Sequence, residues 1–363
     1  MAFEKLGKLF TSSSQKAPES VVGIDLGSSS IKVVELKVED GVVNLETYGE
    51  LQLGPYAKIE VGRVTNLGPA PLSTALTDII REARVTTSAA GVAVPYASSF
   101  VAVISLPSTD TEALQAMIPI EARKYVPVPI AQVTLDWFVI PEVKGVESDR
   151  THSRVLLAAI HNEALNKFKA VISGAKVVSA FNEIEIFSSI RSTVTSQSDT
   201  VMIVDFGASS TKLYIVSQGV VQATHSINVG GQDLTSALSK SLEMSMDAAE
   251  ELKRQVGLIA TDNPRIERAI SFPLERIFVD SRRVLDTYER SGGATVSQIV
   301  LSGGGSIMQG LEEYAHQIFG RTIVRAHPFS KVRYPAVMEE TLREIGPSFA
   351  VAVGVALRRL QEG

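Results

Sequence analysis

The chain has 363 residues, of which 45% are hydrophobic, 21% charged and 6% aromatic, a composition that excludes dominant disorder and suffices for two packed domains. Its 35 Lys and Arg residues against 40 Asp and Glu residues give a net charge of −5, so no basic excess exists to bind nucleic acid through its phosphates. The absence of cysteine excludes disulfides, thiolate catalysis and Cys-based metal sites, and fits a reducing compartment.

Residues 1–19 are predicted to form a flexible N-terminal tail. Phe3, Leu6 and Phe10 recur at helical spacing, so a short amphipathic arm is the alternative. Charged residues interrupt any signal-peptide core, and no apolar run approaches the roughly 18 residues of a bilayer-spanning helix. We therefore expect a soluble protein.

The first predicted hairpin begins at Val21. The segment VVGIDLGSSSIKVVELKVEDGVV indicates an apolar strand, a D-x-G-x-S-S turn, an alternating strand and a second glycine turn. Glycine lets the backbone bend tightly and a ligand approach closely, while successive N–H groups and serine hydroxyls suit phosphate oxygens. Asp25, just before the turn, fits a position beside the waters of a Mg²⁺ ion. Alone, such a turn is weakly specific, because D-x-G also ends ordinary hairpins.

The stretch from Leu106 to Phe181 predicts an inserted α+β unit. It opens with Pro107 and a Ser/Thr–Glu entry into a helix, and it reaches an alternating strand around residues 135–140. The segment SRVLLAAIHNEALNKFKAVISGAKVVSAF, from Ser153, then predicts a strand, a helix, a glycine stop and another strand.

A second copy of the hairpin, VMIVDFGASSTKLYIVSQGVV, begins at Val201. Two copies in two halves favour a nucleotide clamped between domains over two unrelated hairpins. We assign no role to the two matching lysines, which as strand residues can face outward. The matched pairs are Asp25 and Asp205, Gly27 and Gly207, Ser29 and Ser209, Ser30 and Ser210, and Lys32 and Lys212.

Two further segments of the second half support the clamp. SINVGGQDLTSALSKSLEMSMDAAEELKRQ, from Ser226, predicts a glycine turn and helices that carry Glu250 and Lys253, which by themselves would be an exposed helical ion pair. IVLSGGGSIMQG, from Ile299, predicts a buried strand, a glycine loop and a helix N-terminus suited to a phosphate or a ribose edge.

Together these residues resemble the actin-like ATPase superfamily, which includes actin, sugar kinases, DnaK-type chaperones and FtsA. Residues 24–32 and 204–212 are similar to its two phosphate loops and 301–310 to its adenosine loop. FNEIEIFSSIR, from Phe181, and GPSFAVAVGVALRRL, from Gly346, resemble its two hinge-crossing helices. The resemblance implies a two-lobed α/β fold of duplicated ribonuclease-H-like domains with an FtsA/PilM-type extra α+β subdomain. The expected domains are a tail (1–19), a first lobe (20–105, 182–198 and 346–363), an inserted subdomain (106–181) and a second lobe (199–345).

The resemblance also implies an ATP and Mg²⁺ site between the lobes. Asp25 and Asp205 would hold the metal through its waters. Glu185 and Asp205 would be the catalytic residues, with Glu185 orienting the attacking water from the hinge; the alternative for Glu185 is a solvated carboxylate favoured by a helix dipole. The implied nucleotide-binding residues are Asp25, Gly27, Ser28, Ser29, Asp205, Gly207, Ser209, Glu250, Lys253, Gly303, Gly304 and Gly305.

Within the superfamily, EARKYVPVP from Glu121 and NEIEIF from Asn182 are most similar to the PilM family of type IV pilus assembly proteins. FtsA usually ends in an amphipathic membrane helix, whereas this sequence stops at ALRRLQEG, which also favours PilM. The similarity implies a cytoplasmic nucleotide-binding interaction protein, at most a slow ATPase, at the inner face of the inner membrane. Its partner would be the N-terminal cytoplasmic tail of a PilN-like inner-membrane protein, docking near the inserted subdomain under the influence of the nucleotide state.

Two alternatives remain. An FtsA-like, filament-forming scaffold recruited to the membrane shares the extra subdomain, so self-association stays open. A small-molecule kinase uses the same clamp but needs a general base facing a second pocket, and the five histidines form no motif. None of them follows a phosphate turn: they are His152, His161, His225, His316 and His327. We adopt the interaction protein as the working interpretation.

Overall fold

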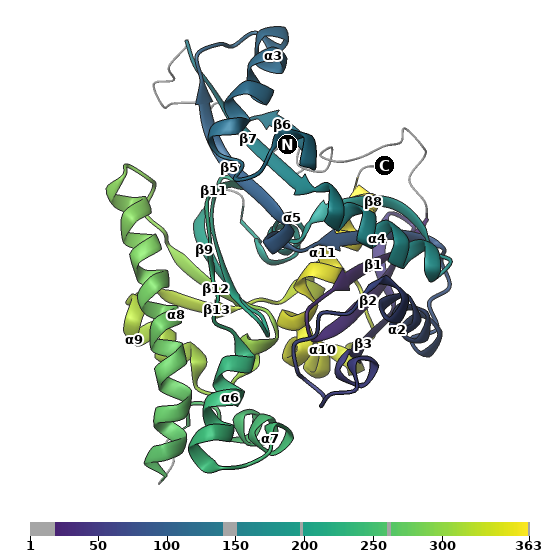
Figure 1. Cartoon of the computed structure of the whole chain (residues 1–363), viewed down its shortest axis with the longest axis vertical. Coiled ribbons are helices and arrows are strands. Elements are labelled where there is room, and N and C mark those ends of the chain that lie inside the picture. The colour runs from purple at the N-terminus through teal and green to yellow at the C-terminus, as the bar shows by residue number, and fades with distance from the viewer. Residues whose placement is uncertain (1–18, 141–150, 197–198, 260–262, 362–363) are drawn as a thin grey trace.

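A computed structural model describes residues 19–140, 151–196, 199–259 and 263–361. Two lobes lie side by side, and a smaller unit projects from them at the top of the view (Figure 1). The predicted N-terminal tail, apart from Glu19, lies outside the described residues. Among the helices of these four ranges, none has both the length and the apolar character needed to cross a bilayer.

The first lobe is built on a five-stranded sheet in the order β3-β2-β1-β4-β8. The first three strands form the predicted antiparallel hairpins, and β4 and β8 run parallel to β1. The strands are β1 (Ser20–Leu26), β2 (Ser30–Glu39), β3 (Val42–Gln52), β4 (Ala89–Val94) and β8 (Val178–Ile184). The helices α2 (Pro69–Glu82), α4 (Asn162–Gly174) and α11 (Ala350–Gln361) cover this sheet.

The second lobe repeats this topology with the order β11-β10-β9-β12-β13, as the duplicated sequence predicts. Its strands are β9 (Thr200–Phe206), β10 (Thr211–Ser217), β11 (Val220–Ile227), β12 (Gln298–Ser302) and β13 (Thr322–Arg325). Its helices are α6 (Gly231–Leu242), α7 (Met246–Val256), α8 (Pro264–Arg290) and α9 (Leu311–Phe319). Alternate residues of β9, among them Met202, Val204 and Phe206, pack in one cluster with Leu274 and Ile277 of α8.

The inserted unit contains an antiparallel sheet in the order β5-β7-β6, with α3 (Thr111–Glu121) packed on it. Its strands are β5 (Ser99–Leu106), β6 (Val133–Val139) and β7 (Ser153–His161). This sheet therefore spans 99–161, whereas α4 and β8 pack within the first lobe, so the strand pairing does not follow the expected boundaries of 106–181. The physical reason is the parallel pairing of β8 with β4.

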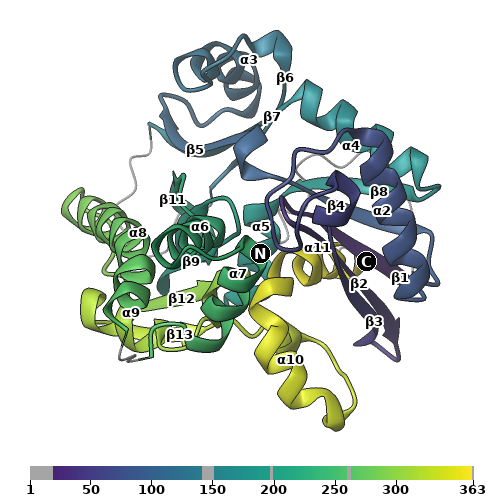
Figure 2. The same ribbon diagram turned by 60° about the horizontal axis from the view of Figure 1, so that its bottom comes forward.

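Two helices join the lobes: α5 (Glu185–Thr193) and α11 pack against each other in the middle of the molecule (Figure 2). They approach so closely at Gly354 that a Cβ there would lie 1.9 Å from the Ser188 carbonyl oxygen. A buried cluster of charges fixes the crossing: the Arg191 guanidinium donates to Glu183 Oε1 at 2.6 Å, and Arg358 lies 3.3 Å from the same oxygen. The remaining helix of the second half, α10 (Glu339–Ile345), lies at the outer edge.

Candidate functional site

The two hairpin turns meet across one cavity of about 1090 Å³ between the lobes. The Ser28 hydroxyl donates to Ser209 Oγ at 3.2 Å, so the turn after β1 touches the turn after β9. Every residue that the sequence predicts for the site lines this cavity: Asp25, Gly27, Ser28, Ser29, Glu185, Asp205, Gly207, Ser209, Glu250, Lys253, Gly303, Gly304 and Gly305. Their roles toward a ligand remain predictions.

The floor of the cavity is acidic, with carboxylates from both halves of the molecule. Asp25 is the penultimate residue of β1, Asp205 is the penultimate residue of β9, and Glu185 begins α5. The pKa of Asp25 is raised from 3.8 to about 6, mainly by burial and also by the negative charges of Glu185 and Asp205. Lys32 and Lys212 oppose this rise with their positive charges.

Glu185 is buried, which excludes the alternative of a solvated carboxylate at a helix start. Its Oε1 accepts the Tyr96 backbone N–H at 2.6 Å, and its Oε2 accepts the Lys212 ammonium at 2.8 Å. Tyr96 directly precedes the inserted unit and its hydroxyl lies 2.9 Å from Thr224 Oγ1 on β11. Glu185 thus connects the cavity floor to both the second lobe and the start of β5.

Asp205 is also held in place. The Tyr214 hydroxyl donates to its Oδ2 at 3.2 Å, and the Lys212 ammonium lies 3.6 Å from the same oxygen. Burial raises the pKa of the Tyr214 hydroxyl well above its ordinary value, so this group stays a hydrogen-bond donor.

Lys32 and Lys212, to which the sequence assigns no role, both line the cavity. The sheet register places Lys32 opposite Asp25 and Lys212 opposite Asp205, because each hairpin repeats the same spacing from aspartate to lysine. That repeated spacing was the signal that could have identified them.

Glu250 and Lys253 form the expected ion pair at 2.6 Å, but the pair is half-buried against the glycine turn before α6. The Lys253 ammonium also donates to Thr235 Oγ1 at 3.0 Å and to the Gly231 carbonyl at 3.2 Å. Burial lowers the pKa of Lys253. These contacts hold both side chains at the cavity wall, which a freely exposed ion pair would not do.

The three glycines after β12 differ in what surrounds them. Gly303 has φ +81°, and a Cβ on it would lie 2.4 Å from Asp205 Oδ1. A Cβ on Gly305 would lie 2.6 Å from the Phe206 ring, whereas a Cβ on Gly304 would meet nothing closer than Ser348 Cβ at 3.9 Å. Gly303 and Gly305 are therefore required by packing, and Gly304 opens onto the cavity.

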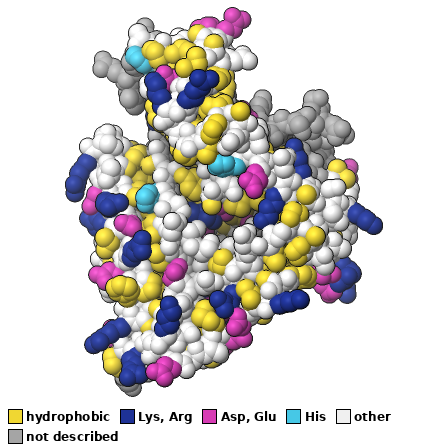
Figure 3. Space-filling model, in the orientation of Figure 1, with side chains coloured by type: hydrophobic (Ala, Val, Ile, Leu, Met, Phe, Trp, Pro, Cys, Tyr) yellow, Lys and Arg dark blue, Asp and Glu magenta, His cyan; other side chains and the backbone are white. Residues whose placement is uncertain are grey.

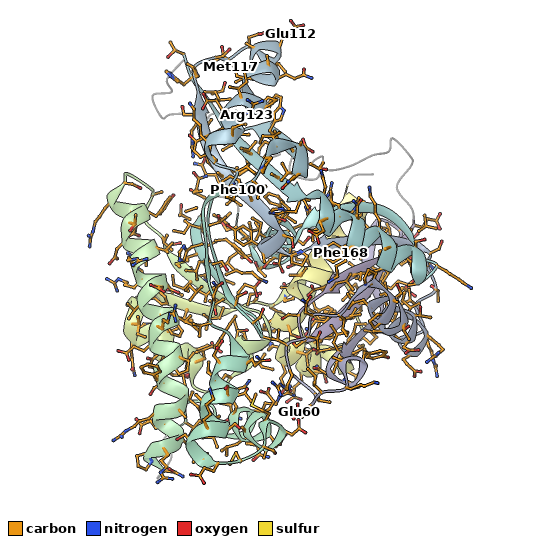
Figure 4. The ribbon with its side chains drawn as sticks, in the orientation of Figure 1. Glu60, Phe100, Glu112, Met117, Arg123 and Phe168 are labelled. Atoms are coloured by element: carbon orange, nitrogen blue, oxygen red, sulfur yellow. The ribbon has the colours of Figure 1, made fainter. Side chains whose placement is uncertain are left out.

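A loop of the first lobe contacts α6 of the second lobe beside the cavity, a contact that the sequence did not indicate. The Val64 N–H donates to Gln232 Oε1 of α6 at 2.6 Å, and the Thr65 N–H donates to the Ser28 carbonyl at 2.8 Å. Figure 4 shows Glu60, at the beginning of this loop, close to α7.

The cavity lining also includes residues of α4 and of the segment 67–72, and we call this part of the cavity the arm. Leu67, Leu72, Ala164 and Phe168 give this arm apolar walls, and the charged side chains of Glu163 and Lys167 lie along it. Figure 4 shows Phe168 on the side of α4 that faces the centre of the molecule. On the face drawn in Figure 3, Lys and Arg side chains are interspersed with Asp and Glu rather than gathered in a patch of one sign.

Comparisons with known proteins agree with this geometry. The family described as "Type IV pilus assembly protein PilM" matches residues 23–360. The solved "PilM-PilN type IV pilus biogenesis complex" superposes with a TM-score of 0.80 at 25% identity, covering 95% of this chain and 99% of that chain. Cell division protein FtsA of Neisseria meningitidis serogroup B is 24% identical over 92% of this chain and 88% of its own length.

Similarity of fold extends to MreB5 of Spiroplasma citri, whose structure bound to ADP superposes with a TM-score of 0.54 at 13% identity, covering 94% of this chain and 96% of that chain. A structure of the same protein bound to AMPPNP superposes with a TM-score of 0.50. These superpositions confirm the two-lobed actin-like fold that the sequence predicts.

Proposed function

Because this chain belongs to the family of type IV pilus assembly protein PilM, we propose that it is a nucleotide-binding component of pilus assembly that binds the tail of a PilN-like inner-membrane protein. The observation that carries this proposal is one cavity in which two glycine turns meet and whose arm is lined by α4, the helix that directly follows β7 of the inserted unit. We place the protein in the cytoplasm, at the inner face of the inner membrane, where such a tail would hold it.

The residues of the cavity fit ATP with Mg²⁺. The hydroxyls of Ser28 and Ser209 lie one hydrogen bond apart, so phosphate oxygens beside them could accept hydrogen bonds from the hydroxyls and backbone N–H groups of both turns. The open side of Gly304 leaves room for a nucleoside. Asp25 and Asp205 would hold Mg²⁺ through its waters, and the metal would neutralise phosphate charge. The ADP and AMPPNP in the MreB5 structures support this assignment by fold.

Glu185 and Asp205 are the proposed catalytic pair for a slow hydrolysis. Glu185 lies on the floor of the cavity, and its contacts with the Tyr96 backbone N–H and the buried Lys212 ammonium fix its carboxylate. A fixed carboxylate can orient a water for attack on the terminal phosphate.

The tail of the partner is proposed to dock in the apolar arm along α4. This arm adjoins the inserted unit, and its mixture of apolar walls with Glu163 and Lys167 suits a short peptide that orders on binding. Because the arm and the nucleotide end belong to one cavity, occupation of one end is expected to change affinity at the other.

Calorimetric titration with ATP–Mg²⁺ and with a synthetic tail peptide, singly and together, tests the proposal. We expect each to bind alone and the affinity of the second to change by about fivefold or more when the first is present. Binding of neither ligand would contradict the proposal, and binding of both with unchanged affinities would remove the nucleotide-dependent part.

A pair of variants on one helix tests the location of the tail. Ala164→Arg places a long side chain in the arm and should abolish peptide binding, while ATP–Mg²⁺ still binds. Asn166→Arg, on the exposed side of the same helix, is the matched control and should bind both. Peptide binding by Ala164→Arg at unchanged affinity would place the tail elsewhere.

An FtsA-like scaffold is the second candidate, favoured by the similarity to FtsA along most of the chain. Sedimentation with ATP–Mg²⁺ distinguishes the two, since a filament former pellets above a critical concentration and an interaction protein does not.

A further inference from the structure

The ammonium group of Lys212 lies in the middle of the acidic floor. Its Nζ is 2.8 Å from Glu185 Oε2 and 3.6 Å from Asp205 Oδ2, and its side chain is only 17% exposed. Glu185 follows the last strand of the first lobe, whereas Asp205 and Lys212 belong to the second. One cation therefore joins carboxylates from both sides of the interlobe boundary.

The corresponding lysine of the first hairpin points elsewhere. The Lys32 ammonium donates to Ser30 Oγ at 2.7 Å and pairs with Glu50 at 3.1 Å, a carboxylate that is 35% exposed. The two lysines at equivalent positions of the repeat thus contact different residues. Of the two, only Lys212 lies within 4 Å of Glu185 and Asp205.

A floor of three carboxylates needs a counter-charge. Buried charges without a partner are strongly destabilising, and like charges in one site resist joint ionisation. In a nucleotide site the usual counter-charge is a divalent metal, but here an ammonium that belongs to the chain already occupies hydrogen-bond distance from Glu185.

We propose that Lys212 is a positioning residue that serves as the resident counter-ion of the floor, holding Glu185 and Asp205 in place without a divalent metal. The loss of nucleotide affinity on removal of Mg²⁺ should then be smaller than in a site whose carboxylates have no counter-ion. The first consequence, that Lys212 stabilises the floor without a metal, concerns the protein alone. The second, the effect on nucleotide binding, rests on the proposed function.

Thermal unfolding without nucleotide, in EDTA and in millimolar Mg²⁺, tests the first consequence. Lys212→Met should unfold at a lower temperature in EDTA and regain part of the loss in Mg²⁺, because the metal replaces the missing cation. The wild type and Lys212→Arg should respond to Mg²⁺ little and equally, and the control Lys32→Met, whose ammonium pairs with Glu50 rather than with Glu185 or Asp205, should respond less than Lys212→Met. A Lys212→Met variant that ignores Mg²⁺, or a Lys32→Met variant that responds as strongly, would overturn the proposal.

Should Lys212→Met fail to fold, the double variant Lys212→Met with Glu185→Gln removes both charges of the closest pair. Recovery of a folded protein by the double variant supports an electrostatic role. Its failure to fold would assign Lys212 to packing and overturn the proposal.

Binding of ADP measured with and without Mg²⁺ tests the second consequence. The wild type should lose at most about tenfold in affinity on metal removal, and Lys212→Met about a hundredfold or more. Equal losses would contradict the proposal. If the wild type binds no nucleotide in either condition, the proposed function fails, while the Mg²⁺ response of the nucleotide-free variants still decides the role of Lys212.

Discussion

Burial of the Asp25 carboxylate lowers the stability of the folded protein, although the same carboxylate is proposed to hold Mg²⁺. Since its folded-state pKa of about 6 exceeds the ordinary 3.8, the native protein holds a proton between these values that the unfolded chain releases. The free energy of unfolding contributed by Asp25 therefore falls as pH rises through this window, and the full cost is present at pH 7.

We expect Asp25→Asn to raise the melting temperature of the ligand-free protein at pH 7 by roughly 2 °C and to abolish Mg²⁺-dependent nucleotide binding. At pH 4 the difference in melting temperature should nearly vanish, because wild-type Asp25 is then protonated when folded. Calorimetric melting at both pH values measures this. A variant less stable than the wild type at pH 7 would show that the carboxylate is not disfavoured by burial.

A substitution of Glu185 provides a second test at the scale of a single residue. Glu185→Gln keeps an acceptor for the Tyr96 N–H but loses the charge, so ATP binding should stay within a few-fold while phosphate release falls about a hundredfold. Single-turnover measurement of phosphate release provides the number. Turnover equal to that of the wild type would return Glu185 to a structural role.

At the scale of elements, the glycine loop after β12 contains one glycine that is needed for packing and another that lines the cavity. Substitutions at the two positions should therefore affect stability and nucleotide binding separately. Gly305→Ala would drive a methyl group into the Phe206 ring and should cost about 1–3 kcal/mol of unfolding free energy. Gly304→Ala meets open space, so its stability should match the wild type while nucleotide affinity falls, because the new methyl group occupies the cavity. Denaturant unfolding and calorimetry on both variants check this contrast. Loss of stability in Gly304→Ala would contradict it.

The sequence predicted individual strands and helices better than it predicted which strands pair in a sheet. Alternating apolar residues and the repeated glycine turns identify the hairpins of both lobes, and their duplication predicts the shared sheet order. Which sheet β8 joins was not predictable, because period-two burial describes one strand and not its distant neighbour β4. For Lys32 and Lys212, alternation alone did not indicate the cavity side, and only their repeated spacing from Asp25 and Asp205 could have done so.

The loop 60–67 escaped prediction for a related reason. Its contacts with Gln232 and Ser28 are made mainly by backbone N–H groups, which carry no signature in side-chain pattern. Most candidate site residues, by contrast, lie in or beside glycine turns whose backbone geometry constrains the sequence, and all of the candidates line one cavity.

At the scale of the whole molecule, the hydrogen bond between Val64 and Gln232 links the two lobes beside the cavity. Gln232→Ala should raise hydrogen exchange at residues 62–65 and weaken nucleotide binding about threefold to tenfold, mainly through faster dissociation. Gln222→Ala, which removes the acceptor for Arg154 between β11 and the inserted unit, is the matched control. Equal exchange in loop 60–67 for both variants would indicate that the loop does not depend on Gln232.

The first lobe reaches completion only after the second has been made. Ala352, Val353 and Leu357 of α11 share a buried cluster with Val34 and Leu36 of β2, and a Cβ on Gly23 would lie 2.1 Å from the Ala352 carbonyl oxygen. During vectorial synthesis one face of the N-terminal sheet thus leaves the ribosome exposed and apolar, and stays so while roughly 300 further residues are translated. Chains that lack α11, whether nascent or truncated, should consequently bind holdase chaperones until α11 is synthesised and covers that face.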